Sequence, residues 1–480
     1  MSIRGTAWRA FVIAAIGASP IATAPLSAQG TLPDSIVHRI DAIFSRYSPE
    51  TPGCALGVFE NGRIVLEKGY GSANIEYGVP WTPTTPTIMG SVSKQFTAAA
   101  IALLAEQGRL SLDEDVRRYV PELPDYGKRI TIAELVHHTS GIRDFWALVD
   151  AAGMRYDDGY TVGDVVALAA RQRHLNFDPG AEYNYSNTGY VLLGEIVHRV
   201  SGRTLRQFAD EQIFAPLGMR SSHFHDDHNE PVHGRAFAYS PAPGGGWRIN
   251  VWNNDIVGQG GLMTTVEDLQ KWDENFYTGR VGGAKFLAQQ LERGRLANGT
   301  QIAYAFGLEI GDYRGLPTVE HAGSTGGYRT DITRFPAQHT TVVTLCNVSS
   351  ADATGMARRV ADVVLAGRFT KPVPAAASAR AAARQAGAPV SLSPAQVAPL
   401  AGTYYADELD ARYDLIASGS ALLVRRPRSA APDTLRPTDS LTFRSPGYTL
   451  RFAPAGKDAM TTFTLDNGRV RGVEFRRRGP

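Results

Sequence analysis

Apolar residues recur along this chain with two different periods, and the changes of period divide it into regions. A helical period covers 34–47, and apolar runs at 54–59 and 63–69 predict two strands. Asn61-Gly62 lies between these runs, and that dipeptide is the strongest short-range signal for a β-hairpin. The pattern therefore predicts a helix followed by a hairpin.

Helical patterns dominate the middle of the chain. Thr131 and Glu134 have the spacing of a capping box, which satisfies two backbone N–H groups at a helix start. Gly108 and Gly202 follow periodic stretches and are typical stop signals. The predicted helices cover 94–107, 131–138, 189–200 and 265–272.

Strand patterns return at 328–335 and 340–345. A hairpin at one end, strands at the other and helices between predict an α+β fold, whose terminal strands share one antiparallel sheet flanked by helices. Such pairing would bring Cys54 near Cys346, the only two cysteines. Two cysteines exclude a disulfide-framework fold and a cysteine-rich metal site, while one disulfide and two separate buried thiols both stay open.

The composition changes to Ala, Pro and Ser over 372–394, which is typical of a linker. Beyond it, short alternating segments recur without helices, and Asp466-Asn467-Gly468 is a hairpin signal between the last two. This pattern predicts a small β-barrel or sandwich. The predicted strands are 413–416, 421–425, 441–444, 448–452, 461–465 and 470–476.

The N-terminus has the pattern of a secretory signal. Arg4 and Arg9 precede an apolar run at 10–18, and small residues precede a cleavage position after Ala28. A membrane anchor would need about 20 apolar residues, and Pro20 interrupts this run too early. We therefore expect a periplasmic or secreted protein with four parts: a signal peptide at 1–28, a main domain at 29–368, a linker at 369–393 and a β-barrel at 394–480.

Charge narrows the expected partners. The chain has 49 Lys and Arg and 47 Asp and Glu; removal of Arg4 and Arg9 with the signal leaves 47 of each. A net charge of zero argues against nucleic-acid or anionic-membrane partners, and no later segment is long and apolar enough to span a bilayer. A small molecule or short peptide is the expected ligand.

Ser91 and Lys94 are the most informative pair for chemistry. If they open a helix, their spacing places both side chains on one face, so the amine can reach the serine oxygen. Free amides at the helix start could stabilise an oxyanion. The pair alone is a weak signal, because a solvated helix face could carry it, but Gly90 before it and the apolar helix after it strengthen the case.

Two further motifs would complete a site. Tyr185-Ser186-Asn187 precedes a helix, and near Ser91 its phenol could pass a proton while its amide held Lys94 and a substrate carbonyl. His321-Ala322-Gly323 begins a strand whose glycine permits close approach of another backbone or a ligand. Separately, these motifs could be an ordinary turn and a glycine-rich bend, so the combination is the signal.

In these three motifs the chain resembles the serine β-lactamase and penicillin-binding-protein superfamily, nearest to class C β-lactamases and their D-aminopeptidase, carboxypeptidase and esterase relatives. The family's S-x-x-K, Y-x-N and K/H-x-G motifs occur in the expected order. The segments 135–142 and 260–265 also resemble it, and the likeness spans about 34–365. It implies a β-lactamase/transpeptidase-like fold with a helical subdomain, and the C-terminal part is similar to the lipocalin-like barrel of some relatives.

The resemblance also implies roles. Ser91 would be the acylated nucleophile, Lys94 its base or electrostatic partner, Tyr185 the proton relay and Asn187 a ligand for Lys94 and the substrate. Which of Lys94 and Tyr185 takes the first proton stays open. The substrate-facing strand would contribute His321, Gly323 and Ser324, and the amides of Ser91 and Ser324 would form the oxyanion hole. No cofactor and no metal are expected.

One departure from the family concerns substrates. Efficient β-lactamases of this group usually carry lysine where this chain has His321, and histidine is mostly neutral near pH 7. The expected substrates are therefore small D-amino-acid peptides first, simple esters second and β-lactams third. A penicillin-recognising scaffold without turnover is the alternative from another class.

Other residues are interpreted as secondary. The cluster of His223, His225, Asp226, Asp227, His228 and His233 could bind zinc, but we expect no metal because no regular element fixes its geometry. Ser324 is not taken as the nucleophile, because Ala322 breaks the G-x-S-x-G pattern. Four aromatic residues could line a cleft, although packing is the expected role of each: Trp146, Tyr156, Trp247 and Trp252.

Overall fold

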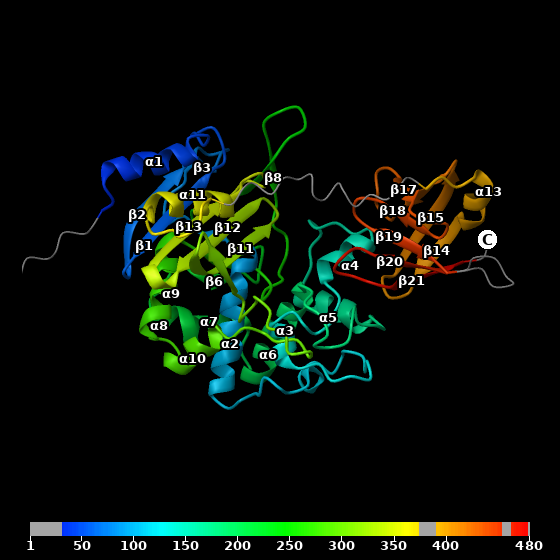
Figure 1. Ribbon diagram of the computed structural model, residues 1–480, viewed down its shortest axis with the longest axis horizontal. Helices are drawn as coiled ribbons and strands as arrows, with labels where there is room; N and C mark the ends of the chain where they lie inside the picture. The colour runs from blue at the N-terminus through cyan, green and yellow to red at the C-terminus, as the bar shows by residue number, and fades with distance from the viewer. Residues whose placement is uncertain (1–30, 374–389, 454–461, 479–480) are drawn as a thin grey trace, which may run out of the picture. The chain divides into compact units, whose positions relative to one another are not determined.

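A six-stranded sheet forms the centre of the main domain in the computed structural model, which describes residues 31–373, 390–453 and 462–478. Its order is β10-β11-β12-β13-β1-β2, and every neighbouring pair is antiparallel. The N-terminal hairpin therefore pairs with the strands that close the domain (Figure 1). The strands are β1 Cys54–Glu60, β2 Arg63–Tyr70, β10 Glu309–Tyr313, β11 Leu316–Thr325, β12 Tyr328–Phe335 and β13 Thr340–Cys346.

The pairing of β1 with β13 brings the two cysteines together. Cys54 lies directly opposite Cys346 in the ladder, and the two form a disulfide. Of the two alternatives left open by the sequence, the disulfide is the one observed. It joins positions 292 residues apart, so it ties the two ends of the domain together.

Each face of the sheet has its own core. On β1, Leu56 and Val58 point to one face, where α1 Asp34–Phe44 and α11 Ala353–Val364 cover the sheet. Ala55 and Phe59 point to the other face and pack in the core that contains α2 Lys94–Glu106 and α9 Val266–Thr278. A strand buried on both faces has to be apolar throughout, which explains the uninterrupted apolar run of β1.

Helices and short strands fill the remainder of the main domain, and α2 packs against α6 below the sheet in Figure 1. The predicted capping box at Thr131 and the stop at Gly202 are confirmed. The helices are α2 Lys94–Glu106, α3 Ile132–Val136, α4 Phe145–Ala151, α5 Val162–Ala170, α6 Asn187–Ser201, α7 Leu205–Ala209, α8 Ala215–Leu217, α9 Val266–Thr278 and α10 Gly283–Gln290. The short strands are β3 Ser72–Asn74, β4 Val79–Pro80, β5 Thr87–Ile88, β6 His223–Phe224, β7 Ala238–Pro241, β8 Trp247–Asn250 and β9 Leu262–Thr264.

The C-terminal part is a closed barrel of β14 to β21, preceded by α13 Pro394–Val397. The six predicted strands are present, while β14 and β17 were not predicted. Each carries few inward apolar residues, such as Tyr404 in β14 and Leu435 in β17, so alternation alone gives a weak signal. The strands are β14 Gly402–Ala406, β15 Ala411–Ser418, β16 Ala421–Arg425, β17 Asp433–Pro437, β18 Thr442–Arg444, β19 Thr449–Phe452, β20 Thr462–Asp466 and β21 Val473–Arg477.

The barrel shares a core with the helical part of the main domain. Phe145 and Leu148 of α4 belong to the same apolar cluster as Tyr413 and Leu422 of the barrel. Beside this cluster Arg143 forms an ion pair with Glu408 at 3.1 Å, and both side chains are buried. The predicted α+β fold with a following β-barrel is thus confirmed, and the barrel packs directly on the helices.

Two predictions concern residues outside the described ranges. The signal peptide at 1–28 lies outside them, and so does 374–389 of the predicted linker. Within the described ranges, no helix combines the length and the apolarity that crossing a membrane requires.

Reduction of the disulfide should destabilise the main domain. The cross-link closes a very long loop, so its loss should lower the free energy of unfolding by about 2–5 kcal/mol. Urea unfolding with and without reductant measures this, and a Cys54→Ala/Cys346→Ala variant is the control because the chain has no other cysteine. Equal midpoints for oxidised and reduced wild-type protein would contradict the expectation.

Candidate active site

Ser91 and Lys94 lie where a tight turn becomes a long buried helix. A 3-10 turn at Gly90–Ser93 leads directly into α2, whose first residue is Lys94. Gly90 has a φ of +52°, and a Cβ there would lie 2.8 Å from the backbone nitrogen of Ser324. Glycine before the serine is therefore required both by the turn and by the close approach of β11.

The amine of Lys94 is buried and has three polar neighbours. Its Nζ lies 3.1 Å from Ser91 Oγ, 2.9 Å from Asn187 Oδ1 and 2.6 Å from the carbonyl oxygen of Gln259. Burial holds the pKa of Lys94 well below its ordinary value; Asp144 opposes this effect and Arg469 adds to it. A neutral amine can donate to the two carbonyl oxygens and accept the Ser91 hydroxyl proton on its lone pair.

Tyr185 places a phenol beside this pair. Lys94 Nζ lies 4.8 Å from the centre of the Tyr185 ring. Burial raises the pKa of Tyr185, and the nearby Ser91 hydroxyl partly offsets the rise. Among the described residues the buried phenol oxygen has no hydrogen-bond partner, so its proton is available to a ligand.

Asp144 fixes the orientation of Asn187, a role that the sequence analysis missed. Asp144 Oδ2 accepts hydrogen bonds from the backbone nitrogen of Asn187 at 2.6 Å and from its Nδ2 at 2.8 Å. The amide oxygen of Asn187 therefore points to Lys94. The position of Asp144 before α4 predicts only a helix cap, which it also is, so the second contact had no sequence signal.

His138 supports Tyr185 and was also not assigned a role. Its ring centre lies 4.1 Å from that of Tyr185, and its Nδ1 accepts a hydrogen bond from the backbone nitrogen of Ser186 at 3.1 Å. Burial holds the pKa of His138 well below its ordinary value. His138 has a φ of +58°, a left-handed conformation that cannot continue the helix, and α3 ends at Val136. Its ring lies against the ring of Tyr185.

His321 is a neutral group with both ring nitrogens engaged. Nδ1 lies 2.7 Å from the carbonyl oxygen of Ala322, which can only accept, so Nδ1 carries the proton. Nε2 therefore accepts the hydrogen bond from the hydroxyl of Tyr304 at 3.0 Å. Burial lowers the pKa of His321 to about 4, and Lys94 adds to the effect. The side chain offers no cation and no free donor to a ligand.

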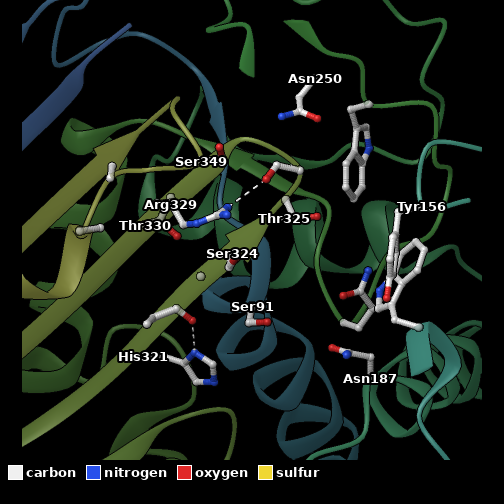
Figure 2. A pocket seen from close by; sticks show the side chains of 18 of the residues that line it. Ser91, Tyr156, Asn187, Asn250, His321, Ser324, Thr325, Arg329, Thr330 and Ser349 are labelled. Atoms are coloured by element: carbon white, nitrogen blue, oxygen red, sulfur yellow. Dashed lines mark hydrogen bonds between the residues drawn. The ribbon is translucent and has the colours of Figure 1, made fainter. Parts of the chain in front are cut away.

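The edge of β11 faces the serine. β10 pairs with β11 only as far as Glu320, so the segment from His321 onward is open on that side. At Gly323 a Cβ would lie 2.1 Å from the carbonyl oxygen of Met89, which shows how closely β11 approaches the turn that carries Ser91. Figure 2 shows Ser91 with His321 and Ser324 on one side and Asn187 on the other.

A cavity of about 1090 Å³ opens over these groups. It is somewhat larger than most ligand pockets, so it can hold more than one amino-acid residue. Apart from the buried Lys94, all predicted site residues line it: Ser91, Tyr185, Asn187, His321, Gly323 and Ser324. Of the four aromatic residues, Trp146, Tyr156 and Trp252 line the cavity, and Trp146 and Trp252 also pack against a core. Trp247 lies in β8 and is not in the lining.

The histidine cluster does not line this cavity, and two arginines contact its members. His223 Nε2 is 3.3 Å from His225 Nδ1, and Glu230 is close enough to complete a group of three candidate metal ligands. However, Arg206 binds Glu230, and Arg235 lies 3.4 Å from His225. These guanidinium groups compete with a cation for the same acceptors. That the cluster binds no metal stays a prediction.

The geometry pairs Ser91 with a buried lysine at a helix start, and the two lie beside the open edge of an antiparallel sheet. Residues 40–365 match the family model described as Beta-lactamase. The chain belongs to that family.

Relatives and solved structures agree with this assignment. A D-aminopeptidase of Gluconobacter oxydans is 26% identical over 320 residues, which are 66% of this chain and 60% of that protein; the chain thus spans well under the whole length of this relative. The octameric penicillin-binding protein homologue from Pyrococcus abyssi has a TM-score of 0.61 at 23% identity, over 92% of this chain and 99% of its own. A D-amino acid amidase from Ochrobactrum anthropi SV3 has a TM-score of 0.59 at 23% identity, over 70% of this chain and 98% of its own. Identities this low establish a shared fold only.

Removal of the Asp144 carboxylate should destabilise the site. In Asp144→Ala, two buried donors of Asn187 lose their acceptor, which should lower the free energy of unfolding by about 1–3 kcal/mol in urea. Asp144→Asn keeps an acceptor oxygen and is the matched control, with a smaller expected loss. Equal stability of wild type and Asp144→Ala would show that Asn187 does not depend on this contact.

Proposed function

We propose that this protein is a serine hydrolase that transfers the acyl group of an amide or ester to water through an acyl-enzyme at Ser91. The observation that carries the proposal is the 3.1 Å contact of Ser91 Oγ with a buried lysine amine whose pKa lies well below its ordinary value. A serine hydroxyl is a weak nucleophile until a nearby base accepts its proton, and Lys94 is such a base.

In the first step, Ser91 Oγ forms a bond to the substrate carbonyl carbon while its proton moves to Lys94 Nζ. The carbonyl electron pair moves onto oxygen, where the backbone amides of Ser91 and Ser324 stabilise the negative charge. The pair then returns as the bond to the leaving nitrogen or oxygen breaks, and the leaving atom receives a proton from Tyr185, which regains one from Lys94. Water repeats the sequence on the ester and releases the acid.

The opposite pKa shifts of Lys94 and Tyr185 support these roles for the two proton carriers. Burial lowers the pKa of Lys94 and raises that of Tyr185, so the lysine is the available base and the tyrosine stays a phenol that can donate. This favours Lys94 as acceptor of the first proton, the choice that the sequence left open. The unpartnered phenol oxygen of Tyr185 suits delivery of a proton to a leaving group.

Small D-amino-acid peptides are the proposed first substrate class, simple esters the second and β-lactams the third. The similarity to D-aminopeptidases supports the first. The neutral, fully engaged His321 provides no fixed positive charge of the kind that a lysine would offer a β-lactam carboxylate, which supports the low rank of β-lactams. A carboxylesterase is the alternative enzyme of the same mechanism.

We place this activity in the periplasm or outside the cell. Two features support this proposal: the signal-like pattern of residues 1–28 and the disulfide between Cys54 and Cys346, because disulfides persist in oxidising compartments. A scaffold that binds penicillin without turnover is the second candidate. The intact contacts of Lys94 with Ser91 and Asn187 favour the enzyme.

Labelling of Ser91 tests the mechanism. A fluorophosphonate should add one adduct on Ser91, found by mass spectrometry, and Ser91→Ala should show none. Because the pKa of Lys94 is depressed, the labelling rate should reach its plateau well below about pH 10. A wild-type protein that stays unmodified would contradict the enzyme, and a penicillin adduct that never hydrolyses would favour the scaffold.

A charge at position 321 should alter substrate preference. His321→Lys places a cation in the cavity, so turnover of nitrocefin should rise relative to that of a p-nitrophenyl ester. His321→Gln is the neutral control and should leave the ratio of the two rates unchanged. A ratio that is also unchanged in His321→Lys would count against this account of specificity.

A further inference from the structure

The barrel contributes one side chain to the catalytic cavity. The turn between β20 and β21, at 467–472, reaches the main domain, and its Arg469 lines the same cavity as Ser91. The Arg469 guanidinium carbon lies 4.9 Å from the centre of the Tyr185 ring. A cation from the C-terminal part of the chain is therefore next to the proposed proton donor.

The turn is held in place by hydrogen bonds from the main domain. Asn176 Nδ2 donates to the carbonyl oxygen of Arg469 at 2.8 Å, and its Oδ1 accepts from the backbone nitrogen of Arg471 at 2.8 Å. Asn184 Nδ2 donates to the carbonyl oxygen of Gly468 at 3.2 Å. The backbone on both sides of Arg469 is thus fixed, while its side chain is exposed to the cavity.

Arg469 differs from other arginines at this contact in having no carboxylate partner among the described residues. Arg143 pairs with Glu408, Arg471 with Glu182 and Arg428 with Asp158 across the boundary between barrel and main domain. Within the part of the chain that the structure describes, no carboxylate lies within 4.0 Å of the Arg469 guanidinium. An arginine whose role was only to join the two parts would be expected to have such a partner.

The other basic groups of the cavity are less available to an anion than Arg469. Lys94 is buried and engaged with three oxygens, and His321 is neutral with both nitrogens bonded. Arg329 also has no carboxylate partner among the described residues, but its Nη1 donates to the carbonyl oxygens of Gly326 and Tyr328, and its side chain is only partly exposed, whereas that of Arg469 is exposed. Arg469 therefore has the most readily available positive charge in the described lining.

We propose that Arg469 binds the carboxylate of the amino acid that leaves during acylation, and so makes the enzyme select peptides with a free C-terminus. This inference rests on the proposed function. Tyr185 would protonate the leaving nitrogen, and in a peptide ending in a free amino acid the carboxylate is only two bonds from that nitrogen. The guanidinium beside the Tyr185 ring is in position to bind it, and arginine binds carboxylates with two parallel hydrogen bonds.

Matched substrates test this proposal. An N-acetylated D-Ala-D-Ala dipeptide and its C-terminal amide differ only in the carboxylate. The wild type should prefer the acid. Arg469→Gln should lower kcat/KM for the acid about tenfold or more, mainly through KM, and change that for the amide by less than about threefold. Arg469→Lys should retain part of the preference.

Arg471→Gln is the control for the turn itself, because Arg471 lies in the same turn and pairs with Glu182 outside the cavity lining. It should leave the acid-to-amide ratio unchanged. If Arg469→Gln lowers kcat/KM equally for both substrates, or shifts the pH profile of both, Arg469 acts only on Lys94 and the proposal is overturned. A wild type that does not prefer the acid would also overturn it. Absence of any Ser91 adduct or ester turnover would instead contradict the proposed function.

Discussion

The burial of one amine beside one hydroxyl is the constraint on which the site depends. Lys94 begins a helix whose next two turns are buried on all sides, so its amine cannot reach water, and the cost of burying a charge favours the neutral form. Asn187 and the Gln259 carbonyl then orient the amine toward Ser91. The core of the domain and the proposed reactivity therefore have the same origin.

The surrounding aromatic groups extend this arrangement. His138 and Tyr304 are buried beside Tyr185 and His321, and both histidines have a pKa below the ordinary value because burial disfavours their charged forms. Neither histidine therefore carries a positive charge that would oppose the arrival of a proton on Lys94. The cation that we propose for an anionic substrate, Arg469, comes from outside the main domain, on the β20–β21 turn.

The barrel is thus part of the site as well as part of the fold. Its apolar residues share a cluster with α4, and Asp144 at the start of that helix holds Asn187. Asp144 also donates its backbone N–H to the carbonyl oxygen of Arg469 at 3.3 Å. Asp144 consequently contacts both the side chain of Asn187 and the barrel turn.

The elements with strong local signals could be predicted from the residues alone: the Asn61-Gly62 hairpin, the Thr131 capping box, the helix after Ser91 and six barrel strands. The sequence also predicted that the three motifs share one site, because the proposed chemistry requires their residue types together. Four features became visible only in the folded chain: the disulfide, the hydrogen bonds of Asp144 with Asn187, the engaged nitrogens of His321 and the position of Arg469. Apart from the contact of His321 with Ala322, they depend on contacts between residues that are distant in the chain, which no local period or spacing encodes.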